Sequence, residues 1–173
     1  MQLSGHHTCL SFDDVPMGHL FLFTQQRAAV LALKVWANPP KQQDKLEGFR
    51  PTPLPKKRMG YAVLSATPQV YFDAPTTKLM LDIDADASLV PDIIATAPKE
   101  THAPGIVFFG KGKTWLSVKY ELPHDYSIGH INLATGEFER HLVMNEELAM
   151  ANWRVVLAKP LPGIDLATYG LAA

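Results

Sequence analysis

The chain of 173 residues is 47% hydrophobic and 19% charged, as in an ordinary globular protein and unlike a disordered one. Its 16 basic and 17 acidic residues give a formal net charge of −1, so the molecule as a whole has no electrostatic attraction to nucleic acid. The single cysteine, Cys9, excludes an intramolecular disulfide and therefore the small secreted disulfide scaffolds. This length predicts one domain over residues 1–173.

The apolar segments are too short to predict a membrane-spanning helix. None approaches the roughly 18 apolar residues of a membrane span. The N-terminal stretch MQLSGHHTCLSFDD has no positive charge ahead of an apolar run, unlike a secretory signal. We therefore expect a location in the cytoplasm, or in a virus particle assembled there, and no membrane partner.

The first predicted strands lie in HLFLFTQQRAAVLALKVWA, residues 19–37, where two apolar runs flank Gln25 and Gln26. We expect a β-hairpin, although residues 26–37 would also suit a helix, because short apolar runs do not separate the two periods. The overlapping stretch SFDDVPMGHLFLF, residues 11–23, resembles the opening of small β modules in bacterial and phage proteins. This resemblance covers a small part of the chain and names no family.

Residues 38–58, NPPKQQDKLEGFRPTPLPKKR, are rich in proline and have no apolar period, so they predict a loop or extended arm. Six basic residues against Asp44 and Glu47 give this segment a local charge of +4. The segment is predicted to be either a solvated loop or a contact arm for an acidic partner. Its basic residues are Lys41, Lys45, Arg50, Lys56, Lys57 and Arg58.

Two hairpins are predicted in the second half of the chain. In residues 105–122 the two-residue loop Lys111-Gly112 places Phe109 opposite Thr114. In residues 126–143 an even-numbered loop keeps apolar side chains on one face and places Leu133 opposite Phe138.

That second register also sets His130 opposite His141 on a polar face, beside Glu139. Two imidazoles roughly 5 Å apart can bind Zn²⁺ or Cu²⁺. A structural or catalytic zinc site needs at least three protein ligands, and Glu139 is the one candidate for a third. An incidental pair of exposed histidines is the favoured interpretation.

Short helices are predicted after Ser88, in SLVPDIIATA, and over residues 145–151, with Asn145 as the cap. A final strand follows at residues 152–159. The tail, residues 160–173, is apolar except for Asp165 and is expected to dock on its own domain or on a neighbour. The tail side chains expected to make this contact are Leu166, Tyr169 and Leu171.

Three aspartates alternate in LDIDADASLVPD, at Asp82, Asp84 and Asp86. A calcium loop of the EF-hand type is excluded, because Ala87 stands where the turn needs glycine and Ile93 where a carboxylate must close the shell. A strand would place all three carboxylates on one face.

On such a face the LMLDID pattern resembles the metal-binding strand of nucleotidyl transferases and primase-polymerases, and it implies Mg²⁺ or Mn²⁺ held for phosphoryl transfer. The favoured interpretation is an exposed strand face with no metal.

These features predict a mainly β domain, a small antiparallel barrel or sandwich of about seven to nine strands with one or two short helices. No catalytic constellation is complete, and the basic arm contrasts with residues 73–100, where six acidic against two basic residues give −4. We therefore expect a non-catalytic interaction or assembly protein without a cofactor, which self-associates or joins a larger bacterial or phage complex. The alternatives are a metal-dependent phosphoryl-transfer or phosphodiester enzyme using Asp82 and Asp84, and a small-ligand or nucleic-acid binding β-barrel.

Overall fold

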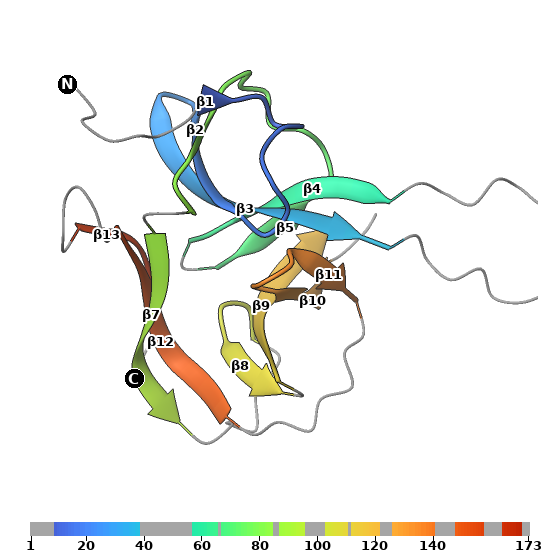
Figure 1. The fold of residues 1–173 in the computed structure, drawn as a ribbon. Helices are drawn as coiled ribbons and strands as arrows, with labels where there is room; N and C mark the ends of the chain where they lie inside the picture. The colour runs from blue at the N-terminus through green and yellow to red at the C-terminus, as the bar shows by residue number, and fades with distance from the viewer. Residues whose placement is uncertain are drawn as a thin grey trace, which may run out of the picture.

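A computed structural model describes residues 9–38, 57–65, 67–84, 87–95, 103–110, 112–121, 126–140, 148–157 and 164–170. These residues form thirteen strands and contain no α-helix (Figure 1), which confirms the predicted mainly β class. The strands are β1 Cys9–Leu10, β2 Leu20–Gln25, β3 Ala28–Ala37, β4 Arg58–Val63, β5 Gln69–Tyr71, β6 Met80–Asp82, β7 Ala87–Ala95, β8 Val107–Gly110, β9 Lys113–Glu121, β10 Tyr126–Asn132, β11 Glu137–Glu139, β12 Leu148–Leu157 and β13 Ile164–Gly170.

Six strands pair in a cycle that runs β3, β4, β5, β9, β10, β11 and back to β3. The β3–β11 and β5–β9 pairs are parallel, so the predicted purely antiparallel arrangement is wrong at these two places. β2, β6 and β1 continue from β3, while β8, β12, β7 and β13 continue from β9. Because these seven strands extend the sheet beyond the cycle, the sheet as a whole is mixed and sandwich-like and is not one closed barrel.

The hairpin predicted near Gln25 is confirmed, and the helical alternative for residues 26–37 is wrong. β2 and β3 pair from Gln25↔Ala28 to Leu20↔Leu33. The turn residues Gln26 and Arg27 both have positive φ, 50° and 68°. Such a turn matches the right-handed twist of the strands that it joins.

The hairpin with the loop Lys111-Gly112 has the predicted register, with Phe109 opposite Thr114 and Val107 opposite Leu116. In the β10–β11 hairpin the even-numbered loop is correct, but the predicted register is wrong by two residues. Phe138 lies opposite Ile131 instead of Leu133. Residues 133–136 form the loop, closed by hydrogen bonds from the N–H groups of Thr135 and Gly136 to the Asn132 carbonyl.

Both predicted helices are wrong where the structure describes them. Residues 87–95 form β7 and residues 148–151 begin β12, and these two strands pair along most of their length. Pro91 is tolerated because β7 pairs with β12 alone in the described part of the chain, and proline is compatible with an edge strand. Trp153 and Val155 of β12 are both fully buried, so the period of β12 is that of a strand with one face in the core.

The main core lies between β3, β9 and β10 on one side and β12 on the other. A second cluster lies under the loop that precedes β2, where Phe12 and Val15 cover Phe21, Phe23 and Tyr61. A third, smaller cluster covers the opposite face of β8 and β9 and contains Ile106, Phe108, Trp115 and Ala149. In Figure 1, β7, β12 and β13 form a separate layer beside the cyclic part of the sheet.

Candidate functional site

In its described part, up to Asp84, the acidic segment leaves the strand after Asp82, so it is not one continuous strand. β6 ends at Asp82, Ile83 is buried, and Asp84 lies beyond the end of the strand. β2 pairs with β6 so that Phe21 lies opposite Asp82, and this pairing brings His19, just ahead of β2, to the carboxylates. Asp86 lies outside the described residues.

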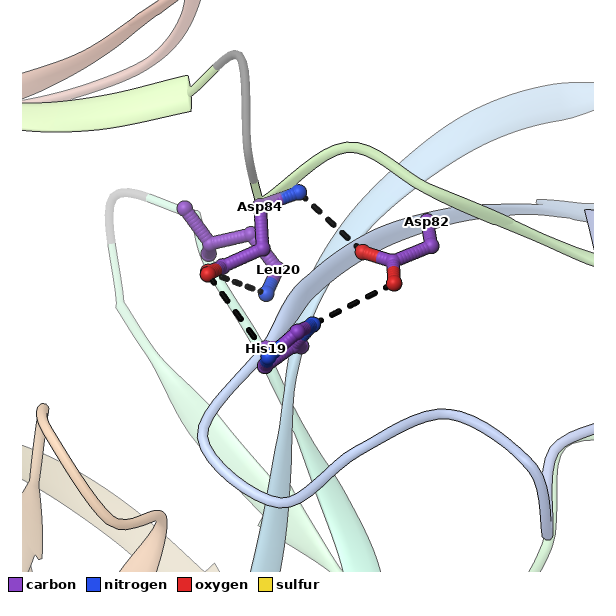
Figure 2. Close-up of polar contacts among 4 residues, drawn as sticks. All are labelled: His19, Leu20, Asp82 and Asp84. Carbon is purple, nitrogen blue, oxygen red and sulfur yellow. Dashed lines mark hydrogen bonds and ion pairs between the residues drawn. The ribbon is translucent and has the colours of Figure 1, made fainter. Parts of the chain in front are cut away.

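Figure 2 shows the carboxylates of Asp82 and Asp84 converging on the His19 imidazole. Nδ1 of His19 lies 3.2 Å from Oδ2 of Asp82, and Nε2 lies 3.9 Å from Oδ2 of Asp84. The backbone N–H of Leu20 donates to Oδ1 of Asp84 at 3.0 Å, and the N–H of Asp84 donates to Oδ1 of Asp82 at 3.1 Å. The two side chains therefore tie the start of β2 to the connection between β6 and β7.

This arrangement uses the carboxylates as hydrogen-bond acceptors. Within the described ranges no group of three or more His, Cys, Asp and Glu side chains is arranged to hold a metal ion. Mg²⁺ prefers near-octahedral oxygen ligands, and at this place the imidazole and two backbone N–H groups already contact the carboxylates. The binding of Mg²⁺ or Mn²⁺ at Asp82 and Asp84 stays a prediction.

A pocket of about 180 Å³ opens beside Asp84. Among the described residues that line it, Asp84 is the one that carries a charge, and the others are glycine, alanine, leucine and valine. The described residues of the lining are Gly18, Leu20, Leu33, Leu64, Asp84, Ala87, Leu89, Leu133 and Val155. The pocket thus combines an aliphatic wall with a single carboxylate.

His130 does not lie on an exposed polar face, contrary to the sequence-based expectation. Its side chain is 3% exposed, Nδ1 lies 3.4 Å from Oγ of Ser117, and the ring lies 5.5 Å from that of Phe108. Glu139, not His141, lies opposite His130, so the predicted histidine pairing is wrong in register. His141 itself lies outside the described residues. The physical reason for the burial is the third apolar cluster, which covers this face of β9 and β10.

The end of the basic segment lies against aromatic side chains. Nζ of Lys57 lies 4.0 Å from the Trp36 ring, on β3, and the guanidinium of Arg58 lies 5.1 Å from the Phe72 ring. Met59 is the direct cross-strand neighbour of Trp36. The other predicted contact residues of this segment lie outside the described ranges: Lys41, Lys45, Arg50 and Lys56.

Two large apolar side chains are exposed at this place, Met59 at 41% and Tyr71 at 36%. Tyr71 stacks on Tyr61, with ring centroids 5.3 Å apart. Partial burial of its phenol group raises the pKa of Tyr71, and the carboxylate of Glu121 raises this pKa further. We call Trp36, Lys57, Met59 and Tyr71 the aromatic–basic patch.

The C-terminal segment forms β13, which pairs with β12 of the same chain and places Tyr169 opposite Trp153. Leu166 lies in the same strand, and Leu171 lies beyond the described residues. Among the strands that the structure describes, β13 pairs with β12 alone, so its outer edge carries backbone groups without a strand partner.

Comparison of the chain with known protein families, with curated proteins and with solved structures finds no match. In the described part of the chain no helix is long and apolar enough to cross a membrane. The sequence analysis missed His19 and the aromatic members of the patch. His19 carries no local spacing signal, because its relation to Asp82 spans 63 residues and depends on the β2–β6 pairing.

Proposed function

We propose that this chain is a non-catalytic interaction protein that self-associates through the aromatic–basic patch. The observation that carries this proposal is the exposure of Met59 on β4 and of Tyr71 on the neighbouring strand β5, where Tyr71 lies opposite Tyr61, two residues after Met59. Trp36 lies opposite Met59 on the other side of β4, and the Lys57 ammonium lies over the Trp36 ring.

Isolated apolar side chains are normal on a protein surface, whereas adjacent ones in a polar frame are typical of contact sites. Aromatic residues and methionine are enriched at protein interfaces, and a charged rim sets the register of the contact. The patch has this composition. Tyr71 and Trp36 offer large rigid surfaces, which lose little conformational freedom on binding.

A second copy of the chain has the chemistry that the patch would recognise. Residues 38–58 carry a charge of +4 and residues 73–100 a charge of −4, so the two segments of different copies attract each other. The outer edge of β13 supplies a second route, because an edge strand can accept a strand from another molecule. We place such an assembly in a bacterial or phage complex formed in the cytoplasm or in a virion.

Light scattering after size exclusion tests self-association, at about 0.05 M and about 0.5 M salt, between which exposed charges become well screened. The wild type is expected to exceed the monomer mass of 19.1 kDa at low salt. Replacing both Met59 and Tyr71 by serine is expected to restore the monomer. The matched control is Leu79→Ser, which removes a side chain exposed at 63% outside the patch. A wild-type monomer at both salt concentrations overturns the proposal.

The rival function, phosphoryl transfer with Mg²⁺ or Mn²⁺ at Asp82 and Asp84, is tested by calorimetry. The metal would compete with His19 and with two backbone N–H groups for the carboxylate oxygens. Binding heat with Mn²⁺ in the wild type that is lost in Asp84→Asn would favour the enzyme. The absence of binding heat in both the wild type and Asp84→Asn would exclude the enzyme function.

A further inference from the structure

The pocket beside Asp84 is formed by two layers of the fold. Leu20 and Leu33 come from the β2–β3 hairpin, and Leu89 and Val155 come from β7 and β12. Its volume of about 180 Å³ is close to that of an engineered apolar cavity of about 150 Å³, lined by leucine, isoleucine and phenylalanine, that stays dry and binds benzene. The pocket therefore has room for a phenyl ring or a short alkyl chain.

Asp84 gives this apolar space a negative charge. Its side chain is 36% exposed and is fixed in place by the N–H of Leu20 on Oδ1. A carboxylate offers about four lone-pair positions, so this N–H leaves acceptor capacity unused. The carboxylate of Asp82 lies next to it and adds a second negative charge, joined to Asp84 by the N–H···Oδ1 contact.

Among the described residues, little positive charge offsets these two carboxylates. His19 is the cation-capable side chain that contacts both, and its Nε2 is 3.9 Å from Asp84, beyond ordinary hydrogen-bonding distance. In the described part of the chain no lysine or arginine forms an ion pair with either carboxylate. The mouth of the pocket is thus electrostatically complementary to a cation with an apolar body.

We propose that this pocket binds a small organic ammonium compound, with a phenyl or short alkyl body between Leu20, Leu33 and Val155 and its ammonium group on Asp84. A charge-assisted hydrogen bond from an ammonium to a carboxylate is shorter and stronger than one between neutral groups. The aliphatic wall contributes by removing the apolar body from water. This site is separate from the aromatic–basic patch and does not depend on it.

The probes are benzylammonium, benzyl alcohol and benzoate, which share a ring and differ in charge. Each is titrated into the full chain labelled with ¹⁵N, and backbone amide shifts are followed. Benzylammonium is expected to bind with a Kd on the order of 0.1–1 mM, typical of so small a ligand. It should move the amides of Leu20, Asp84, Leu89 and Leu133. Benzyl alcohol is expected to bind about tenfold more weakly, because it lacks the charge-assisted contact, and benzoate should not bind.

Two variants separate the contributions of charge and shape. Asp84→Asn keeps an oxygen for the Leu20 N–H and removes the charge, so benzylammonium should fall to the affinity of benzyl alcohol. Leu89→Phe fills the pocket and should abolish the binding of both. Asp73→Asn, a change at an exposed carboxylate outside the pocket, is the control and should leave both affinities unchanged.

Three outcomes overturn the proposal. The first is the absence of shifts at the pocket amides with benzylammonium. The second is equal affinity for benzylammonium and benzyl alcohol in the wild type. The third is equal affinity of the wild type and of Asp84→Asn for benzylammonium, which would show that the carboxylate of Asp84 does not receive the ammonium group.

Discussion

Nδ1 of His19 lies 3.2 Å from Oδ2 of Asp82, although 63 residues separate them in the chain. The contact joins the residue that precedes β2 to the last residue of β6. One residue further along the first segment and two residues further along the second, the N–H of Leu20 donates to Oδ1 of Asp84 at 3.0 Å. These contacts fix part of the pocket wall, because Leu20 and Asp84 both line the pocket.

The His19–Asp82 contact is expected to contribute modestly to stability. Both side chains are partly exposed, and exposed ion pairs contribute about 0.2–1 kcal/mol. A double-mutant cycle of His19→Gln and Asp82→Asn, measured by urea unfolding, should give a coupling free energy in this range. Asn at position 82 retains an oxygen for the N–H of Asp84, so the cycle reports on the imidazole contact alone. Strictly additive effects would show that the contact is not formed in solution.

Gly136 is expected to be among the least replaceable residues of the described chain. Its φ is +68°, and a Cβ there would come within 2.4 Å of the Lys34 carbonyl oxygen and 2.7 Å of the Gly18 nitrogen. Gly112 has a similar φ of +71° with nothing within 4 Å, so it is a matched control. Gly112→Ala should cost about 1 kcal/mol for the backbone conformation alone. Gly136→Ala should lower the free energy of unfolding by a further amount of about 1–3 kcal/mol, because its Cβ overlaps with backbone atoms. Equal urea midpoints for the two variants would contradict the close approach of β3 and the β10–β11 loop.

Lys34 makes stability depend on pH. Its side chain is fully buried on β3, where Nζ donates to the Phe12 carbonyl and lies 3.3 Å from the Phe12 ring centroid. Burial lowers its pKa, and the negative charges of Asp13 and Asp14 oppose this in part. Because the folded pKa lies below the unfolded value of 10.5, the unfolded chain binds more protons in the window between them. Lys34 therefore contributes a stability that rises with pH through that window.

Replacing Lys34 by methionine should remove this rise. The free energy of unfolding is measured for both proteins by urea from about pH 7 to about pH 10, and the difference between them is followed. This difference, wild type minus Lys34→Met, should increase with pH. The comparison cancels the opposite effect of Tyr61 and Tyr71, whose raised pKa values make stability fall as the pH exceeds 10. A difference that is constant with pH would show that the amine is fully charged in the folded protein over this range.

The local sequence was sufficient to predict which residues of two strands lie opposite each other wherever a short turn fixed the register. Lys111-Gly112 allows a two-residue loop, and the predicted partners Phe109 and Thr114 follow from it. In the next hairpin the burial argument placed Leu133 on the strand, whereas the Asn132 side chain accepts the N–H of Ala134 and begins the loop one residue earlier. A side chain that hydrogen-bonds its own backbone can move a turn without changing the apolar pattern.

Contacts between distant strands were not predictable in this way. The segment after Ser88 has an acceptable helix cap, but pairing with β12 satisfies its backbone as a strand. The pocket forms where β2, β3, β7 and β12 meet. The hydrophobic period of any one of these strands does not predict that they meet. The alternation of Asp82 and Asp84 pointed to a segment that also contributes Asp84 to the lining of this pocket. Their partner, His19, was missed because only the β2–β6 pairing brings it there.

The turn between β2 and β3 offers a stabilising substitution. Arg27 is exposed and has a φ of 68°, a conformation that costs a residue with a Cβ about 1–2 kcal/mol. Glycine adopts it freely but loses about 0.5–1 kcal/mol in chain entropy, so Arg27→Gly should raise the free energy of unfolding by about 0.5–1 kcal/mol. Arg27→Ala is the control, because it removes the same charge and side chain and keeps the backbone cost, and it should be close to neutral. Urea unfolding distinguishes the two variants. Equal stabilisation by alanine and glycine would assign the gain to the lost charge instead of the turn.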